Sequence, residues 1–168
     1  MENALFYVID TSALIKMKYD YPISKKKSLW EKCDELIDER RLGAPETVLI
    51  ELKRRDDELH KWAKERQSDL FYDESSCTEC QQDIINKNEG LVDSRRQYEQ
   101  ADVAVIALAR KRRSKPALTY TGVCVVTEEI LPLPNPWRKR KTIPEVCNNY
   151  GLHCIQAEEM ISREGWKI

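Results

Sequence analysis

The most constraining feature of the sequence is a short apolar run that ends at a carboxylate. Residues 5–9 (LFYVI) are apolar at every position and are followed directly by Asp10. A strand that is apolar on both faces is typical of the centre of a parallel sheet covered by helices, because water reaches neither face. Residues 122–127 (GVCVVT) show the same pattern and are followed by Glu128 and Glu129. The sequence therefore predicts two buried strands whose ends carry acidic residues.

Helical patterns lie between these two strands. Residues 25–41 carry apolar side chains at helical spacing, and Gly43 is expected to stop that helix. A second helical pattern opens at Pro45 and continues, bent, to residue 66. Residues 100–113 give the clearest helix, because their small apolar side chains form a face that can pack closely on a sheet.

The remaining segments are shorter. Residues 67–100 are polar and predict only a helix near residues 79–88 and a break at Gly90. After the second strand we expect a stiff proline-rich loop, a helix, a short strand and a last helix, over residues 131–136, 142–150, 153–156 and 157–164.

Strands that alternate with helices predict an α/β fold with a parallel sheet, because each crossover between parallel strands must be long and right-handed. A length of 168 residues is enough for one core and too short for two comfortable ones, so we expect a single domain over residues 1–168. In such sheets ligands bind outside the carboxyl ends of the strands. The two acidic strand ends are therefore the first place to look for chemistry.

The overall charge excludes a general attraction to nucleic acid. The formal net charge is -1, with 41% hydrophobic and 34% charged residues, which is typical of a soluble globular protein. Any nucleic-acid binding must therefore come from local basic patches. The sequence shows neither a secretion signal nor an apolar run long enough to cross a bilayer, so we expect a cytoplasmic protein with no membrane role. Its six cysteines are expected to be reduced thiols or metal ligands and not a disulfide framework.

Four positions place carboxylates where this fold has its ligand site. Asp10 follows the first strand, and Glu51 leans toward the buried side of its helix. Asp102 heads the apolar stripe of its helix, and Glu128 and Glu129 follow the second strand. Like charges gathered in this way repel one another unless a hard divalent cation neutralises them. We expect the first three carboxylates to converge on such a cation.

Each carboxylate also has a simpler interpretation. Asp10 could be the N-cap of the next helix, a role that Thr11 or Ser12 could fill instead. Glu51 could be an exposed glutamate, and Asp102 could stabilise the positive end of its helix. Glu128 and Glu129 could lie in a solvated turn. The pattern of four positions in order carries more weight than any one of them.

The blocks VIDTSALI, PETVLIEL, ADVAVIALA and VVTEE, in that order over about residues 5–130, resemble the four acidic blocks of PIN-domain ribonucleases, which include VapC-like toxins. The later segment IPEVCNNYGLHCI resembles an uncharacterised prokaryotic PIN-like branch. The resemblance implies a three-layer α/β/α PIN-like fold with a central, mainly parallel sheet. It also implies that Asp10, Glu51 and Asp102 are catalytic metal ligands.

The last block departs from the family pattern. PIN domains commonly have T-x-D or T-N-D after the final core strand, whereas this chain has Thr127-Glu128-Glu129. Glu129 takes the position of that aspartate as the fourth catalytic residue. Its longer side chain leaves open whether Glu129, Glu128 or a bridging water contacts the metal, and whether the site holds one ion or two.

By this resemblance the chain is expected to be an endoribonuclease that cleaves single-stranded RNA with Mg²⁺ or Mn²⁺. An antitoxin protein and a homodimer are candidate partners. Histidine-based acid-base catalysis is not expected, because His60 and His153 lie outside the acidic blocks. Two rival functions remain. One is an aspartyl phosphatase, for which the second carboxylate of D-x-D is missing, and the other is a catalytically inactive PIN-like module that binds RNA or protein.

Basic residues near the acidic blocks are candidates for holding RNA, although runs of this kind are commonly solvated faces. Trp137 beside them could stack on a base or pack the proline loop. The candidate RNA-binding residues are Thr11, Ser12, Arg110, Arg138, Lys139, Arg140 and Lys141. A separate weak pattern, Cys77-x-x-Cys80 with Cys147 and Cys154, leaves a structural zinc site open.

Overall fold

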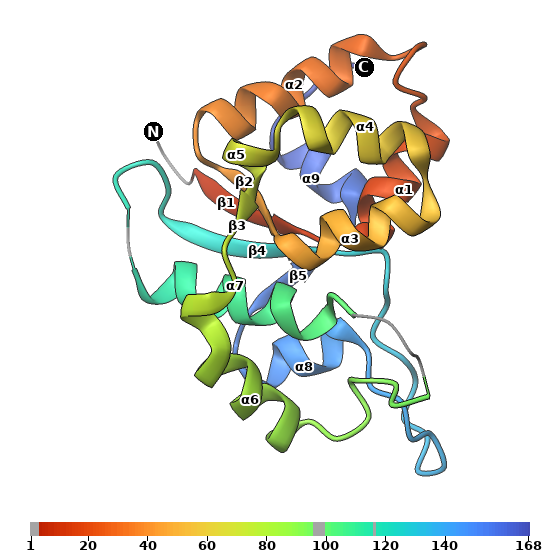
Figure 1. The fold of residues 1–168 in the computed structure, drawn as a ribbon, viewed down its shortest axis with the longest axis vertical. Coiled ribbons are helices and arrows are strands. Elements are labelled where there is room, and N and C mark those ends of the chain that lie inside the picture. The colour runs from red at the N-terminus through yellow and green to blue at the C-terminus, as the bar shows by residue number, and fades with distance from the viewer. Residues whose placement is uncertain (1–3, 96–99, 116) are drawn as a thin grey trace.

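The computed structural model describes residues 4–95, 100–115 and 117–168, and its centre is a parallel sheet of five strands (Figure 1). The strand order is β3-β2-β1-β4-β5, and every pair of neighbours is parallel. The predicted α/β class and three-layer architecture are confirmed. The strands are β1 (Leu5–Ile9), β2 (Leu42–Pro45), β3 (Phe71–Tyr72), β4 (Gly122–Val126) and β5 (His153–Ile155).

Helices cover both faces of the sheet (Figure 1). On one face α7 (Asp102–Ser114) packs directly on the central strands, with α6 (Thr78–Lys87) and α8 (Ile143–Asn149) against it. The helices of the other face are α1 (Thr11–Asp20), α2 (Lys27–Asp38), α4 (Asp57–Glu65), α5 (Gln67–Leu70) and α9 (Ala157–Arg163). α3 (Glu46–Arg55) packs against α1 and α4, and the short 3-10 helix η1 (Ser75–Cys77) precedes α6. None of the helices in these described ranges is long and apolar enough to cross a membrane.

The two apolar runs of the sequence are the two central strands. β1 and β4 pair in register from Leu5 opposite Gly122 to Ile9 opposite Val126. Both faces of these strands are buried, and each large apolar side chain that folding removes from water contributes roughly 1.5 to 3 kcal/mol. The register also places the two strand ends side by side, because the backbone N–H of Asp10 donates to the carbonyl of Val126 at 2.9 Å. The acidic residues that follow the strands therefore start from neighbouring points.

The helix expected over residues 25–41 is shorter than predicted. It ends at Asp38, and Arg40 turns the chain with a positive φ of 58°. Gly43 does not stop this helix, as the sequence had suggested, but lies inside β2. A Cβ atom at Gly43 would collide with the rings of Tyr72 and Phe6, so close approach of the neighbouring strands explains the glycine.

The structure also defines the polar segment that the sequence left open. It contains β3, a strand of two residues, and α6, which matches the helix expected near residues 79–88. Gly90 follows with a φ of 93° and lies against the backbone at Lys139 and Arg140, so the break at this position is confirmed. This contact brings the segment before α7 beside the proline-rich loop after β4.

Candidate functional site

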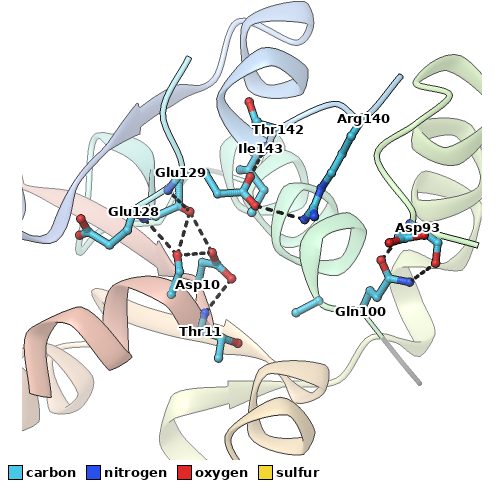
Figure 2. Close-up of polar contacts among 12 residues, drawn as sticks. Asp10, Thr11, Asp93, Gln100, Glu128, Glu129, Arg140, Thr142 and Ile143 are labelled. Atoms are coloured by element: carbon cyan, nitrogen blue, oxygen red, sulfur yellow. Dashed lines mark hydrogen bonds and ion pairs between the residues drawn. The ribbon is translucent and has the colours of Figure 1, made fainter. Parts of the chain in front are cut away.

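Asp10 forms the fixed centre of the site. Its carboxylate is buried and accepts hydrogen bonds from the backbone of Thr11 at 2.7 Å and from the hydroxyls of Ser12 and Thr127 at 2.7 and 2.8 Å (Figure 2). Asp10 is also the N-cap of α1, so neither Thr11 nor Ser12 caps that helix. The capping interpretation of Asp10 is therefore confirmed, and the proposed role of the same side chain in a metal site stays a prediction.

Burial raises the pKa of Asp10, and the neighbouring groups change the same pKa in both directions. The hydrogen bonds from Ser12 and Thr127 lower the pKa, whereas the negative charges of Glu51 and Glu129 raise it. The effect of two further carboxylates on Asp10 shows that acidic side chains from distant parts of the sequence gather at this edge of the sheet.

Glu51 joins three elements at the site. It projects from α3 and is buried, with an exposed fraction of 9%, so it is not the exposed glutamate of the simpler interpretation. Its carboxylate accepts hydrogen bonds from the Thr11 hydroxyl at 2.5 Å and from the backbone N–H of Ala101 at 3.0 Å. Glu51 therefore links the start of α1 to the start of α7 and fixes where Asp102 begins its helix.

Asp102 is the carboxylate with the least support from protein donors. It is half-buried at the first position of α7, and its side chain accepts no hydrogen bond from the described residues. Burial, followed by the negative charges of Asp10, Glu129 and Glu51, raises its pKa to about 7, and Arg140 opposes this. The charges of the other three carboxylates thus act on Asp102, which also lies at the positive end of its helix.

Glu128 and Glu129 leave the sheet in opposite directions (Figure 2). The Glu129 carboxylate accepts from the backbone N–H of Ile143 at 2.7 Å and lies 3.9 Å from the Arg140 guanidinium. The Glu128 carboxylate instead accepts from the backbone N–H of Ala157 at 3.0 Å, at the start of α9. The structure therefore places Glu129 with the other carboxylates and Glu128 outside the cluster.

The chemistry of this donor set suits a hard divalent cation, because four carboxylates share one edge of the sheet and oxygen is the ligand atom that Mg²⁺ and Mn²⁺ prefer. The expected convergence is nevertheless incomplete. Among the residues that the structure describes, no three His, Cys, Asp or Glu side chains form a group that could hold a metal ion as it stands. The reason lies in the contacts above, since Asp10, Glu51 and Glu129 each turn their oxygens toward protein donors.

Thr127 is a site residue that sequence reasoning did not select. Its hydroxyl donates to Asp10 at 2.8 Å, and it accepts from the backbone N–H of Glu129 at 3.2 Å. Ser12 lies 3.2 Å from the same hydroxyl. The sequence contained the signal for this contact. Thr127 ends one buried strand and Asp10 ends another, and where two such strands are neighbours the hydroxyl can donate to the carboxylate.

The candidate RNA-binding residues separate into two groups. Thr11, Ser12 and Arg140 lie at the carboxylates. Arg110 lies elsewhere, with its guanidinium 3.2 Å from Asp83 and stacked 4.1 Å from the centre of the Tyr150 ring. The expected role of Arg110 in holding RNA stays a prediction, as does that of the exposed Lys139.

Arg138 and Lys141 stabilise the loop that follows β4. The Arg138 guanidinium pairs with Glu145 at 2.7 Å, and the backbone N–H of Lys141 donates to Gly90 at 2.9 Å. Arg140 and Lys139 remain as the more exposed cations of this basic run.

The cysteines form no disulfide among the described residues. The neighbouring thiol of Cys154, and then burial, raise the pKa of the Cys147 thiol. Burial raises the pKa of the Cys80 thiol. Arg110 lowers that pKa, and Cys77 and Asp83 raise it. The four residues of the zinc pattern therefore interact as two separate pairs.

A family model described as "Domain of unknown function (DUF4411)" matches residues 7–168. No curated protein matches the chain. The match begins within β1 and extends through α9, so it includes every carboxylate of the site.

Proposed function

We propose that this chain, which belongs to the DUF4411 family, is a metal-dependent endoribonuclease that cleaves single-stranded RNA at the carboxylate cluster. The observation that carries the proposal is Asp102. Three other carboxylates act on it and contribute to the rise of its pKa to about 7, although its side chain accepts no hydrogen bond from the described residues. Buried like charges of this kind are costly without a cation and are common at functional sites.

Asp10, Glu51, Asp102 and Glu129 would hold Mg²⁺ or Mn²⁺. When bound, such an ion lowers the pKa of a coordinated water and neutralises charge on the phosphate. The chain itself supplies orientation. Thr11, Ser12 and Thr127 fix the Asp10 carboxylate from three directions.

The second carboxylate to be oriented is Glu51. The Thr11 hydroxyl and the backbone of Ala101 hold it between α1 and α7. Groups that donate hydrogen bonds to a metal ligand set the direction of its oxygens, so loss of one weakens metal affinity.

RNA is the proposed substrate because cations lie next to the acidic cluster. Arg140 lies 3.9 Å from Glu129, and Lys139 precedes it with an exposed side chain. A phosphodiester backbone needs such cations, since the carboxylates alone repel it. A toxin role with a small antitoxin partner, and assembly as a homodimer, are part of the same proposal through the PIN-domain resemblance.

The proposal is tested by combining metal binding with cleavage. Mn²⁺ should raise the melting temperature of the wild-type protein, because a ligand that binds only the folded state stabilises it. Asp10→Asn should lose most of that rise and all cleavage of a single-stranded RNA. Glu128→Gln is the matched control, because it changes the neighbouring acidic residue that faces α9, and it should keep both properties. Wild-type cleavage by Asp10→Asn would contradict the proposal.

A second candidate function is a PIN-like module that binds RNA or protein without cleavage. The specific observation in its favour is that the carboxylates, in the described residues, form no group that could hold a metal as it stands. The same experiment separates the two functions. An inactive module would bind single-stranded RNA with equal affinity in the wild type and in Asp10→Asn, and would show no Mn²⁺-dependent product.

A further inference from the structure

The loop between β4 and α8 exposes large apolar side chains close to the carboxylate site. Trp137 and Leu133 are 89% and 87% exposed, and Ile130 and Leu131 are also exposed. Trp30 and Trp62, by contrast, are buried against each other in the core. An exposed tryptophan beside other apolar residues is typical of a surface that binds something.

The same loop is anchored at its base. The backbone N–H of Ile143 donates to Glu129 at 2.7 Å, and the Thr142 hydroxyl donates to the carbonyl of Ile130 at 3.3 Å. The backbone of Lys141 bonds to Gly90 at 2.9 Å. These contacts fix the start and the end of the loop relative to one carboxylate of the site.

The tip of the loop is also ordered by its own sequence. Pro132, Pro134 and Pro136 each restrict φ, and Asn135 accepts a hydrogen bond from the backbone N–H of Trp137 at 2.9 Å. The Arg138 guanidinium pairs with Glu145 of α8 at 2.7 Å. Trp137 is therefore held outward on a restrained backbone, which lowers the entropic cost of binding a ligand.

Cations adjoin the exposed tryptophan. Lys139 and Arg140 line a cleft of about 420 Å³ together with residues 90–95, a segment in which Arg95 is paired with Asp93 at 3.1 Å. The Lys139 side chain makes no hydrogen bond or ion pair within the described ranges. The Arg140 guanidinium lies 3.9 Å from Glu129, and its charge also lowers the pKa of Asp102. Figure 1 shows this segment and the loop side by side, below the carboxyl end of β4.

We propose that Trp137 is a stacking platform for an unpaired base of single-stranded RNA, while Lys139 and Arg140 hold the adjacent phosphates. The proposal rests on the proposed function, since it names how the substrate is held at that site. An aromatic ring next to cations suits a nucleotide, which offers a flat face for stacking and a negative charge beside it. The loop leads directly from Glu129, so a strand bound on it would continue toward the carboxylates.

The test is RNA binding without metal. In an Asp10→Asn background with EDTA, binding of a single strand of about eight nucleotides, a length within the usual site sizes, is measured by anisotropy and by tryptophan fluorescence. We expect Trp137→Ala to weaken binding about 5- to 150-fold and to abolish most of the fluorescence quenching. Trp137→Phe should retain most of the affinity, because a phenyl ring still stacks. Leu118→Ala is the matched control, since Leu118 is fully exposed outside the loop, and it should bind as the parent does.

Several outcomes would overturn this proposal. Unchanged affinity in Trp137→Ala would do so, as would an equal loss in Leu118→Ala. If Trp137→Ala leaves RNA affinity unchanged but converts a dimer to a monomer in sedimentation, the loop is a contact between two copies and the stacking role is refuted. This binding assay contains no metal, so it is independent of the test of metal-dependent cleavage. A loss of RNA affinity in Trp137→Ala supports the stacking role even if Mn²⁺ fails to stabilise the wild type. An unchanged affinity refutes the stacking role and leaves metal-dependent cleavage to its own test.

Discussion

Replacement of Asp102 by asparagine should stabilise the metal-free protein, and more so at high pH. The pKa of Asp102 is raised from 3.8 to about 7 in the folded state. A carboxyl with a raised pKa binds more protons when folded, so its contribution to stability is complete below the unfolded pKa and is lost as the pH rises through the folded one. Asparagine carries no charge and avoids that loss.

The size of the effect follows from the same shift. A rise from 3.8 to about 7 sets a ceiling of about 4 kcal/mol at 1.36 kcal/mol per pKa unit. Solvent screening of this half-buried group reduces the value by roughly half. Loss of a negative charge at the start of α7 costs about 0.3 to 1 kcal/mol in the opposite direction. We therefore expect Asp102→Asn to be more stable by about 1 to 2 kcal/mol at pH 8, a rise in Tm of roughly 2 to 8 °C.

The assay is thermal unfolding in EDTA at pH 5 and pH 8. The stability difference between Asp102→Asn and the wild type should be small at pH 5, where the wild-type carboxyl is largely protonated in the folded state, and larger at pH 8. With Mn²⁺ present the order should reverse, because the variant lacks one proposed ligand. A difference that is the same at both pH values would refute the electrostatic reasoning, and a destabilised variant at pH 8 would show that Asp102 has a stabilising partner in the folded state.

Three further predictions concern packing and hydrogen bonds. Gly90→Ala should destabilise the protein by more than about 1 kcal/mol, measured by urea unfolding, because a Cβ atom there would meet the backbone at Lys139 and the φ is positive. Thr127→Val should raise the apparent Kd for Mn²⁺ by about 10- to 100-fold in a titration followed by Tm, since Asp10 loses one of the donors that orient it. Leu52→Ala, which truncates a fully buried side chain of α3, should cost about 2 to 5 kcal/mol in the same urea assay.

The central part of the fold follows from local sequence, whereas its edges do not. β1 and β4 could be predicted because a strand buried on both faces must be apolar at nearly every position. β2 and β3 are too short to show a periodic pattern, and Gly43 has the same appearance as a helix stop when its neighbours in space are unknown. Pairing between strands, rather than local preference, defines these two elements.

The candidate site shows the same division. The order of the acidic blocks predicted that Asp10, Glu51 and Asp102 would converge. Besides burial, the charge of Glu51 raises the pKa of Asp10, and the charges of Asp10 and Glu51 raise the pKa of Asp102, yet these side chains form no metal-holding group among the described residues. The choice between Glu128 and Glu129 could not be made, because it depends on whether each side chain turns toward α8 or α9. The partners of Arg110 could not be foreseen for a similar reason, since they lie on α6 and at the end of α8.

The strand order also determines when the site can exist during protein synthesis. β1 is made first, yet its neighbour β4 is complete only at Val126, and the two pair along their whole length. Until the ribosome has released residues well beyond Glu129, Asp10 has no Thr127 to orient it and Asp102 has only part of its acidic surroundings. At typical rates of synthesis, about 5 to 20 residues per second, several seconds separate the first carboxylate from the last. The carboxylates of the site therefore gather only after β4 and the residues that follow it have been made, and a chain that stops before Thr127 contains Asp10 without the hydroxyl that orients it.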